Sequence, residues 1–596
     1  MSVAIVRRIA GPVLHARRDG AFGLREAVRV GPQSLLGEVV AIHDDEIVVQ
    51  VYEDTTGLRP GTAVHGDGQP LAIRLGPALL GRIFDGLLRP LAAGSGAFVQ
   101  PGLRGGAALR LRFEPSVAVG ARVAGGAVIG RALGADGRAQ RCLAPPDAAG
   151  IVESIAAIGE HADDATVCVL RDDDGRRREI AMSHAWPVRQ PRPVSRRLTA
   201  SAPLVTGQRI LDGLFPVAQG GKAAIPGGFG TGKTVLLEAL AKGCNADVIV
   251  YLGCGERGNE MAGVLDEFPE LTDPRSGRPL MERTVIIANT SNMPVAAREA
   301  SIYCAVTVAE YFRDQGLHVA LMADSTSRWA EALREVSGRF GELPGEGGYP
   351  AYLASRIADF YERAAVVETL AGDTGSVTIM GAISPPSGDF SEPVTSHTKR
   401  YVKAFWALDV KRAQARFYPA IHPLTSYAED AAGFAPWWAT QGNGQWLELR
   451  RRMLTLLDEQ ARLERMARII GKDALPARQR LTLLNAELVN EAFLRQSAFS
   501  PVDRVCSPQR LSAMMRLLGR FVDLAEAALD AGVEPEQVGS LACLRSLQRM
   551  GEDIGDHELP RLAELQARVE REFAALTPQA PQAAPETPEA RDAADR

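Results

Sequence analysis

The amino-acid sequence predicts a multidomain α/β protein with an N-terminal β-barrel, a β-rich insertion, a central parallel-sheet domain and a C-terminal helical bundle. Three observations support this prediction. The chain has 596 residues, more than a single hydrophobic core usually organises. Short strand-like runs come first, and strands then alternate with helices. Long amphipathic helices follow.

The first part of the chain is predicted to form two β-domains. Residues 1–75 contain runs such as GEVVAIHDDEIVVQVY, broken by Gly and Pro, which is typical of a small β-barrel. Residues 76–112 form a Gly-rich connecting segment. Residues 113–188 are β-rich again, and the spaced glycines of VAVGARVAGGAVIG suit the tight turns of a compact insertion. The Arg- and Pro-rich piece at 186–197 is expected to be a linker, because it can sustain neither helix nor ladder.

Residues 189–434 are predicted to form the central α/β domain. Apolar strand candidates such as DVIVYLGC and HVALMADS alternate with helical stretches such as KTVLLEALAKG, as in a parallel sheet covered on both faces. Residues 435–576 carry apolar side chains at three- and four-residue spacing, which predicts the helices of a bundle. The Ala-, Pro- and charge-rich tail at 577–596 is expected to be disordered.

The composition is that of a soluble globular chain, with 46% hydrophobic and 23% charged residues. The net charge of −5 gives no general reason to expect nucleic-acid binding. The seven cysteines show no metal-ligand spacing, so we expect buried or partly buried thiols in a reducing compartment. No segment reaches the roughly 18 to 20 uncharged apolar residues that span a bilayer, and the charged start lacks a signal peptide's apolar core. We therefore expect a cytosolic chain that can reach a membrane only through partners.

A phosphate-binding loop is the strongest functional signal. The strand candidate at 223–226 leads into GGFGTGKT, and VLLEALAKG continues as a helix, so the motif G-x-x-x-x-G-K-T has the flanks that it requires. The glycines let several backbone N–H groups face one anion, and the helix start adds its positive dipole end. Lys233 can reach the β- and γ-phosphates of a nucleoside triphosphate, and the Thr234 hydroxyl is a magnesium ligand. The predicted nucleotide-binding residues of the loop are Gly227, Gly228, Phe229, Gly230, Thr231, Gly232, Lys233 and Thr234.

Two acidic side chains follow other predicted strands. Asp324 closes an apolar run, at a place where a carboxylate can hold magnesium through water. Glu256 follows the predicted strand at 247–253, and a carboxylate there can polarise the water that attacks the γ-phosphate. The adjacent Arg257 can neutralise charge that develops on the phosphoryl oxygens. A strand-end cap and a surface Glu–Arg turn are the purely structural alternatives.

At these motifs the sequence resembles the catalytic A subunits (alpha chains) of the V/A-type rotary ATPases, which include the bacterial V-type ATP synthases. The resemblance extends from about residue 3 to 570 and includes the blocks TGQRILDGLFPVAQGGKAAIPGGFGTGKT, LMADSTSRWAEALREVSGR and ISPPSGDFSEPVT. These blocks are long and specific to the family. The resemblance implies a central P-loop domain of the RecA-like type, ATP and ADP as substrates, and Mg²⁺ as cofactor.

The resemblance also implies roles for the residues whose motifs match. The catalytic positions correspond to Lys233, Glu256, Arg257 and Arg328. The metal-binding positions correspond to Thr234, Asp324 and Glu260. The aromatic positions that sandwich the adenine ring correspond to Tyr418 and Phe499. Without the motif match, a single aromatic side chain is more often part of a core.

The resemblance further implies a ring in which three such chains alternate with three copies of a homologous, non-catalytic B subunit, an A3B3 hexamer. The B subunit would supply an arginine finger to the shared site. The insertion would meet a peripheral stalk, and a central stalk would connect the ring to a membrane sector that moves protons or sodium ions. The chain would then lie on the cytoplasmic side of the cell membrane, without a transmembrane segment or a nucleic-acid partner.

Some positions depart from the usual family pattern. Gly228 stands where relatives have Pro or Ala, which should make the loop more flexible without removing a ligand. Thr231 replaces Ser or Cys, and Gly347 stands where an acid is usual. None of these differences removes a catalytic group.

Two other functions remain open at this point. A related hexameric motor, either a secretion-apparatus ATPase or an RNA translocase of the Rho type, is one. The insertion and the GERGNEM block disfavour the former, and the acidic net charge without an aromatic, basic RNA-binding segment disfavours the latter. A structural subunit that holds nucleotide without turnover is the other, and the presence of both Lys233 and Glu256 disfavours it.

Overall fold

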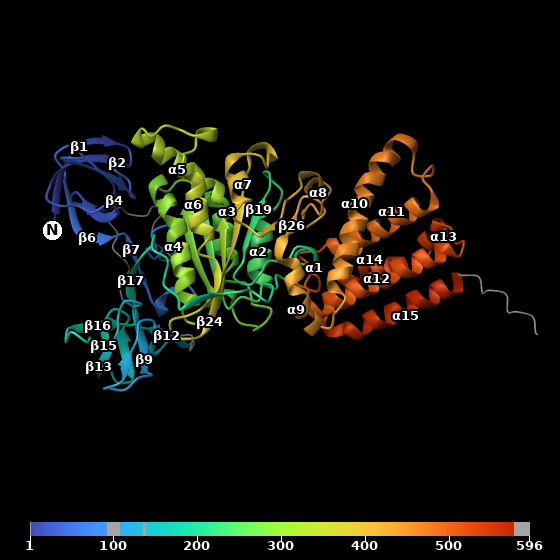
Figure 1. Ribbon diagram of the computed structural model, residues 1–596, viewed down its shortest axis with the longest axis horizontal. Helices are drawn as coiled ribbons and strands as arrows, with labels where there is room; N and C mark the ends of the chain where they lie inside the picture. The colour runs from blue at the N-terminus through green and yellow to red at the C-terminus, as the bar shows by residue number, and fades with distance from the viewer. Residues whose placement is uncertain (1, 92–107, 135–138, 577–596) are drawn as a thin grey trace, which may run out of the picture. The chain divides into compact units, whose positions relative to one another are not determined.

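The structure is a computed structural model that describes residues 2–91, 108–134 and 139–576, apart from the side chains of Asn259, Glu260 and Leu265. The chain forms two compact units that meet in sequence between Thr440 and Gln441. The first unit holds the β-domains and the α/β domain, and the second is helical (Figure 1). The predicted fold class is confirmed. The predicted tail at 577–596 lies outside the described residues, as does the middle of the predicted connecting segment.

The N-terminal domain is a closed barrel of antiparallel strands in the order β1-β2-β5-β4-β3-β6. Its strands are β1 (Ser2–Ala10), β2 (Val13–Asp19), β3 (Glu26–Val30), β4 (Leu35–Ile42), β5 (Glu46–Val51) and β6 (Ala63–Pro70). Alternate residues of β5, namely Ile47, Val49 and Val51, are fully buried in the barrel core. This is the two-residue period that a strand imposes on its side chains.

The insertion consists of two four-stranded antiparallel sheets, ordered β10-β13-β15-β16 and β12-β11-β9-β14. Its strands are β9 (Arg110–Pro115), β10 (Arg122–Val123), β11 (Val128–Leu133), β12 (Ala139–Leu143), β13 (Gly150–Ile155), β14 (Gly159–Ala162), β15 (Thr166–Arg171) and β16 (Arg177–Ala181). Phe113, Val152 and Leu170 belong to one core that both sheets share. Strand β7 (Ala72–Leu75) precedes the insertion and pairs with β17 (His184–Pro187), which follows it. This pairing holds the two ends of the insertion together.

The α/β domain is built on a sheet whose strands follow the order β26-β25-β19-β24-β22-β20-β21-β8. Its long parallel strands are β19 (Lys222–Pro226), β24 (Thr374–Ile383), β22 (His318–Asp324), β20 (Val248–Glu256) and β21 (Thr284–Thr290). Shorter strands are β8 (Ile83–Asp85), β18 (Arg196–Leu198), β23 (Ala365–Glu368), β25 (Ala404–Phe405) and β26 (Tyr427–Ala428). Strand β8 comes from the predicted connecting segment and pairs in parallel with β21, which the sequence did not indicate.

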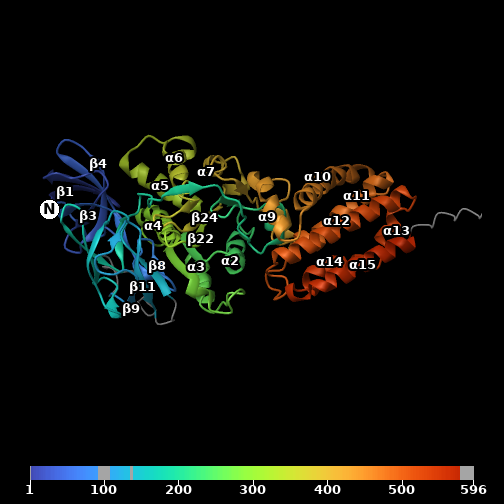
Figure 2. The same ribbon diagram turned by 60° about the horizontal axis from the view of Figure 1, so that its bottom comes forward.

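Helices cover both faces of this sheet. They are α1 (Arg209–Leu214), α2 (Lys233–Gly243), α3 (Gly258–Glu267), α4 (Val295–Arg313), α5 (Thr326–Phe340), α6 (Leu353–Tyr361), α7 (Pro393–Thr398), α8 (Val410–Gln414) and α9 (Ala435–Thr440). Helix α4 packs on one face against β20 and β22, and α2 packs on the other face against β22 (Figures 1 and 2). The alternation of strand and helix candidates therefore predicted the correct layers.

The prediction of a linker at 186–197 is wrong. Strand β17 ends inside this segment, and β18 pairs with β23. Two of its arginines are largely withdrawn from solvent. Arg189 forms ion pairs with Glu38 and Glu299, and Arg192 is 3% exposed. The prolines fall outside the hydrogen-bonded interior of these short strands, where they remove no ladder bond.

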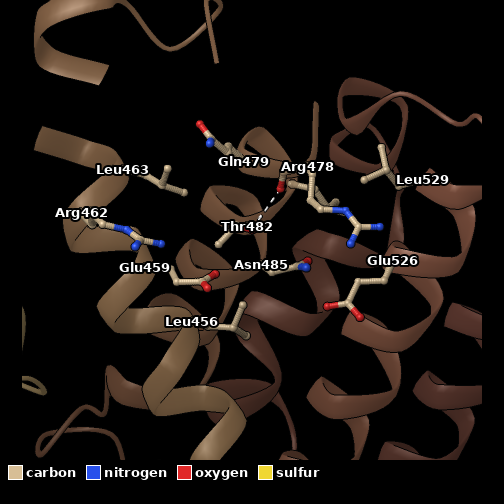
Figure 3. Close-up of a pocket in the computed structure, with 11 residues that line it drawn as sticks. Leu456, Glu459, Arg462, Leu463, Arg478, Gln479, Thr482, Asn485, Glu526 and Leu529 are labelled. Atoms are coloured by element: carbon tan, nitrogen blue, oxygen red, sulfur yellow. Dashed lines mark hydrogen bonds between the residues drawn. The ribbon is translucent and has the colours of Figure 1, made fainter. Parts of the chain in front are cut away.

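The second unit is a bundle of α10 (Trp446–Ile470), α11 (Ala477–Val489), α12 (Pro508–Asp530), α13 (Pro535–Gly539), α14 (Cys543–Asp553) and α15 (Leu559–Leu576). Helices α12, α14 and α15 lie side by side (Figures 1 and 2). A cavity of about 340 Å³ between α10, α11 and α12 is lined by polar side chains that include Glu459, Asn485 and Glu526 (Figure 3).

Two further expectations can be compared with the structure. All seven cysteines are free and buried, as predicted. Across the described ranges, no helix is both long enough and apolar enough to cross a bilayer.

Candidate nucleotide site

The predicted phosphate-binding loop connects β19 to α2. The Gly227 amide donates to the carbonyl oxygen of Ile383 on β24 at 3.0 Å, and the Thr231 hydroxyl donates to the Gly228 carbonyl at 2.8 Å. Gly230 and Gly232 adopt φ of 76° and 84°, a conformation that glycine accepts without strain. The loop therefore has the curled backbone that the motif predicts.

The N-terminus of α2 is not capped by a side chain. Its N-cap residue is Gly232, which has no side chain that could cap the first turn. Because the first N–H groups of a helix have no partner within the helix, this end of α2 is suited to an anion.

Lys233 lies over the loop itself. Its Nζ donates to the carbonyl oxygens of Gly227 and Gly228 at 2.8 and 2.9 Å. The ammonium group is therefore held at the loop, close to the N–H groups of α2 that would face an anion. This position fits the predicted phosphate contact.

Thr234 and Asp324 are brought together although they are far apart in the sequence. The Thr234 hydroxyl donates to Asp324 Oδ2 at 2.8 Å. Asp324 closes β22, is 2% exposed, and lies in register with Gly253 of the neighbouring strand β20. Burial, reinforced by the charge of Asp324, raises the pKa of Tyr251 well above its usual range. The phenol therefore stays protonated and can hydrogen-bond to Asp324.

This pair fits a magnesium ion. Mg²⁺ prefers oxygen ligands, keeps several waters, and usually takes only one or two protein ligands beside substrate phosphates. The Thr234 hydroxyl and the Asp324 carboxylate supply two oxygen atoms at the foot of the loop. No cluster of three or more His, Cys, Asp or Glu side chains suited to a metal occurs in the part of the chain that the structure describes. Two protein oxygen atoms suit an ion whose other ligands are phosphate and water.

Glu256 lies at the same edge of the sheet. Strand β20 continues past its predicted end at Gly253 and includes Glu256. The Glu256 carbonyl accepts a hydrogen bond from the Ser291 amide at 2.9 Å, so the tips of β20 and β21 are joined. The side chain of Glu256 is half-buried. Because β20 is adjacent to β22, Glu256 and Asp324 come from neighbouring strand ends.

Arg257 contacts the tip of the phosphate-binding loop. Its guanidinium lies 4.9 Å from the ring centroid of Phe229, whose side chain is 80% exposed. A cation–π contact of this kind brings an exposed arginine to the loop without neutralising its charge. The structure therefore places Arg257 beside the phosphate-binding loop, and its catalytic role stays a prediction.

Two further arginines, Arg298 and Arg328, flank the backbone just before Glu256. A Cβ atom added at Gly255 would lie 2.8 Å from Arg328 Cβ and 2.8 Å from Arg298 Nε. Arg328, near the start of α5, also hydrogen-bonds to Glu331 at 3.0 Å. The sequence reasoning missed Arg298, which is 8% exposed. Its position in NMPVAAR, in the first turn of α4 directly after β21, was the available signal, because the helix begins at the same edge of the sheet.

The two predicted adenine-binding residues and Glu260 come from different parts of the chain. Tyr418 is 42% exposed, and its Cε1 would lie 3.6 Å from a Cβ at Gly232, so the ring is beside the start of α2. Phe499 belongs to the second unit and is 94% exposed. Its pairing with Tyr418 stays a prediction. The side chain of Glu260 lies outside the described residues, on helix α3.

Family models match a segment of each of the four domains. Residues 207–428 match the nucleotide-binding domain of the ATP synthase alpha/beta family, and residues 435–538 match the C-terminal domain of V and A type ATP synthase. Residues 108–189 match the barrel-sandwich domain of alpha/beta subunits, and residues 6–67 match the family's β-barrel domain.

Curated relatives identify the type of subunit within this family. The A subunit of the A-type ATP synthase of Methanopyrus kandleri is 48% identical over 581 residues, which cover 96% of this chain and 98% of the relative. The chain belongs to the A subunits of the V/A-type ATP synthases. The corresponding protein of Thermococcus sibiricus is 47% identical over 565 residues, with 94% and 97% of the two chains covered. The predicted resemblance is confirmed, and as a family member the chain is the catalytic subunit of a rotary ATP synthase, a complex of several different chains.

A solved structure shares the fold. The assembled ATPase EscN of the type III secretion system of enteropathogenic E. coli matches with a TM-score of 0.62 at 23% identity, covering 87% of this chain and 100% of that chain. At this identity the likeness shows the fold alone. The secretion-apparatus alternative therefore gains nothing beyond a common architecture.

Proposed function

We propose that this catalytic subunit makes or hydrolyses ATP at the carboxyl edge of its central sheet, where it binds magnesium–ATP. The supporting observation is the hydrogen bond between Thr234 and Asp324 beneath an uncapped helix N-terminus. It joins a phosphate-binding loop and a metal-binding carboxylate from two separate strands. A loop that only terminated β19 would need no such partner.

The loop and its helix bind the triphosphate. The N–H groups at the start of α2 and the ammonium of Lys233 contact the β- and γ-phosphate oxygens. Thr234 and Asp324 would hold Mg²⁺, and the family resemblance implies Glu260 as a further acid. When bound, the ion neutralises charge on the phosphate oxygens. Tyr418 stacks on the adenine ring, and the family resemblance implies the same role for Phe499.

Glu256 and the arginines act on the γ-phosphate. In the hydrolysis direction, the carboxylate of Glu256 accepts a hydrogen bond from the attacking water and aligns it with the phosphorus atom. Arg257 and Arg328 neutralise the charge that develops on the equatorial oxygens, and the nearby Arg298 adds to this positive edge. In the synthesis direction the same groups hold ADP and phosphate in line.

We further propose that a homologous B subunit completes the site with an arginine finger in an alternating A3B3 ring. The exposure of Phe229 and Tyr418, 80% and 42%, leaves the loop and the side of α2 accessible to a nucleotide and a neighbour. Central and peripheral stalks would couple this ring to a membrane sector that moves H⁺ or Na⁺. The chain would be a peripheral protein at the cytoplasmic face of the membrane.

Magnesium-dependent ATP hydrolysis tests this proposal. The chain should be nearly inactive alone and active when it is assembled with its cognate B subunit. Glu256→Gln in the assembly should lower turnover by about 10²- to 10⁴-fold, because proton acceptance by the carboxylate is lost. Glu270→Gln, which changes an exposed glutamate, is the matched control and should retain activity.

Two results would contradict the proposal. Equal activity with and without the B subunit would show that the site needs no neighbour. Binding of ATP by the assembly without turnover would instead identify a structural nucleotide-binding protein.

A further inference from the structure

A second polar cavity lies between the barrel and the α/β domain. It has a volume of about 330 Å³ and is lined by residues of β2, β4 and β5 on one side and of α4, α5 and α6 on the other. This volume is at the lower end of the roughly 300–1,000 Å³ typical of ligand pockets. The lining shares no residue with the phosphate-binding loop.

The carboxylates that face this cavity are already engaged. Both oxygens of Glu299 accept hydrogen bonds from Arg189, at 2.9 and 2.7 Å. Burial disfavours the ionised form of Glu299, but the charge and hydrogen bonds of Arg189, together with the charges of Arg356 and Arg25, outweigh it and hold the pKa below its usual value. Glu342 accepts a hydrogen bond from the Tyr352 hydroxyl at 3.0 Å. The acidic groups therefore have little capacity left for a cationic ligand.

Two guanidinium groups that face the cavity, those of Arg25 and Arg356, can still form hydrogen bonds. The Arg25 guanidinium approaches a carboxylate oxygen of Glu38 only to 3.7 Å, which is too long for a hydrogen bond. The Arg356 guanidinium lies over the ring of Tyr352 at 5.5 Å. Within the described ranges, that guanidinium makes no hydrogen bond.

A buried amide points to a missing acceptor. Gln50 is 3% exposed, and its Nε2 atom is buried without a hydrogen-bond partner among the described residues. Gln50 lines the cavity together with Arg25 and Arg356. A buried donor without an acceptor costs free energy, so natural proteins keep few of them. No solvent reaches this Nε2 atom in the structure, so an anion in the cavity would satisfy it once the amide turns toward the cavity.

We propose that this cavity binds a phosphate group carried by a small metabolite. Arg25 and Arg356 supply guanidinium groups, whose planar forks suit phosphate oxygens, and Gln50 supplies an amide donor. A water molecule occupies about 30 Å³ of liquid volume, so the cavity has room for more than a bare phosphate. A phosphate ester should therefore bind more tightly than inorganic phosphate.

Calorimetric titration of the full-length chain tests this site. The titrations use a Lys233→Ala background without magnesium, so that the phosphate-binding loop does not retain the anion. Inorganic phosphate and glycerol phosphate are the two probes, and sodium chloride at matched ionic strength is the reference. We expect saturable binding at one site, tighter for the ester. This experiment requires no ATP turnover, so its result is independent of the proposed catalytic mechanism.

Variants in the same background identify the cavity. Arg356→Gln should weaken binding by about tenfold or more, because a charge-assisted hydrogen bond is lost. Gln50→Met removes the buried donor and should weaken binding without lowering the thermal midpoint. Arg334→Gln is the matched control, because the Arg334 guanidinium lies over Tyr349 at 5.1 Å in a similar way but does not line the cavity. Absence of saturable binding, or binding unaffected by Arg356→Gln and Gln50→Met, would overturn the proposal.

Discussion

The carboxyl edge of the central sheet and the buried face of α4 use charged side chains in opposite ways. At the edge, Glu256 is half-buried and Arg257 is exposed, so both remain accessible to a ligand. Beneath α4, Glu310 is 1% exposed and accepts hydrogen bonds from Arg363 and from the Arg192 amide. Burial disfavours its ionised form, yet the charge of Arg363 outweighs this and lowers the pKa of Glu310.

The difference separates structural charges from functional ones. A buried ion pair must be fully matched, because each charge has lost its hydration. A catalytic charged group must remain able to interact with its substrate. Removing one charge should therefore damage stability beneath α4 and ligand chemistry at the edge.

The largest effect is expected from Glu310→Gln. The substitution leaves the buried guanidinium groups of Arg363 and Arg313, each 3% exposed, without their shared carboxylate. Loss of one partner of a buried pair typically costs about 3–5 kcal/mol. Urea or thermal unfolding of the variant would measure the loss.

Arg122→Gln is the control for this prediction. It breaks an ion pair with Asp173 in which the side chains are 67% and 76% exposed. Exposed pairs contribute about 0–1 kcal/mol, so the unfolding midpoint should hardly change. Equal midpoints for the two variants would show that burial does not decide the energy of these pairs.

The same contrast explains what the sequence could predict. The loop at 227–234 was recognisable because its spacing is local, and α2 begins and ends as the helical pattern indicated. The buried network was not recognisable, because Arg189 meets Glu38 at a separation of 151 residues and Glu299 at a separation of 110. No local pattern connects such positions. Arg298 was missed for a related reason, since its nearness to Glu256 depends on the sheet order, which places the start of α4 beside the end of β20.

A buried acid whose hydrogen-bond donors are uncharged sharpens the comparison. Asp212 accepts hydrogen bonds from the Thr206 amide and hydroxyl and from the Gly207 amide. Burial raises its pKa to about 7, although these hydrogen bonds oppose the shift. This carboxyl therefore titrates near neutral pH, where Glu310 stays ionised.

The sign of the resulting pH dependence follows from the raised pKa. The stabilising contribution of protonated Asp212 is complete below the unfolded value of about 3.9 and is lost as the pH rises through about 7. Between pH 5 and pH 7 the free energy of unfolding should fall by about 2 kcal/mol through the ionisation of Asp212. Asp212→Asn, which cannot ionise, should flatten the decline in unfolding midpoint over this interval. An unchanged slope in the variant would show that Asp212 is not the titrating group.

The smallest effect is expected at Gly228 of the phosphate-binding loop. A Cβ at Gly228 would meet Val410 Cγ2 at 3.5 Å, an ordinary van der Waals contact. Gly228→Ala should therefore stabilise the nucleotide-free chain by about 0.4–1 kcal/mol, because the unfolded chain loses freedom. The stiffer loop should also bind ADP slightly more tightly, since it has less freedom to lose on binding.

Gly227→Ala is the matched test at the neighbouring position. Its Cβ would lie 2.5 Å from Thr231 Oγ1 and 2.8 Å from Leu408 Cβ, so the loop would have to shift. Thermal midpoints and ADP affinities of the two variants should consequently move in opposite directions. If Gly228→Ala weakens ADP binding as strongly as Gly227→Ala does, the mobility of the loop, and not only its shape, is required for binding the phosphates.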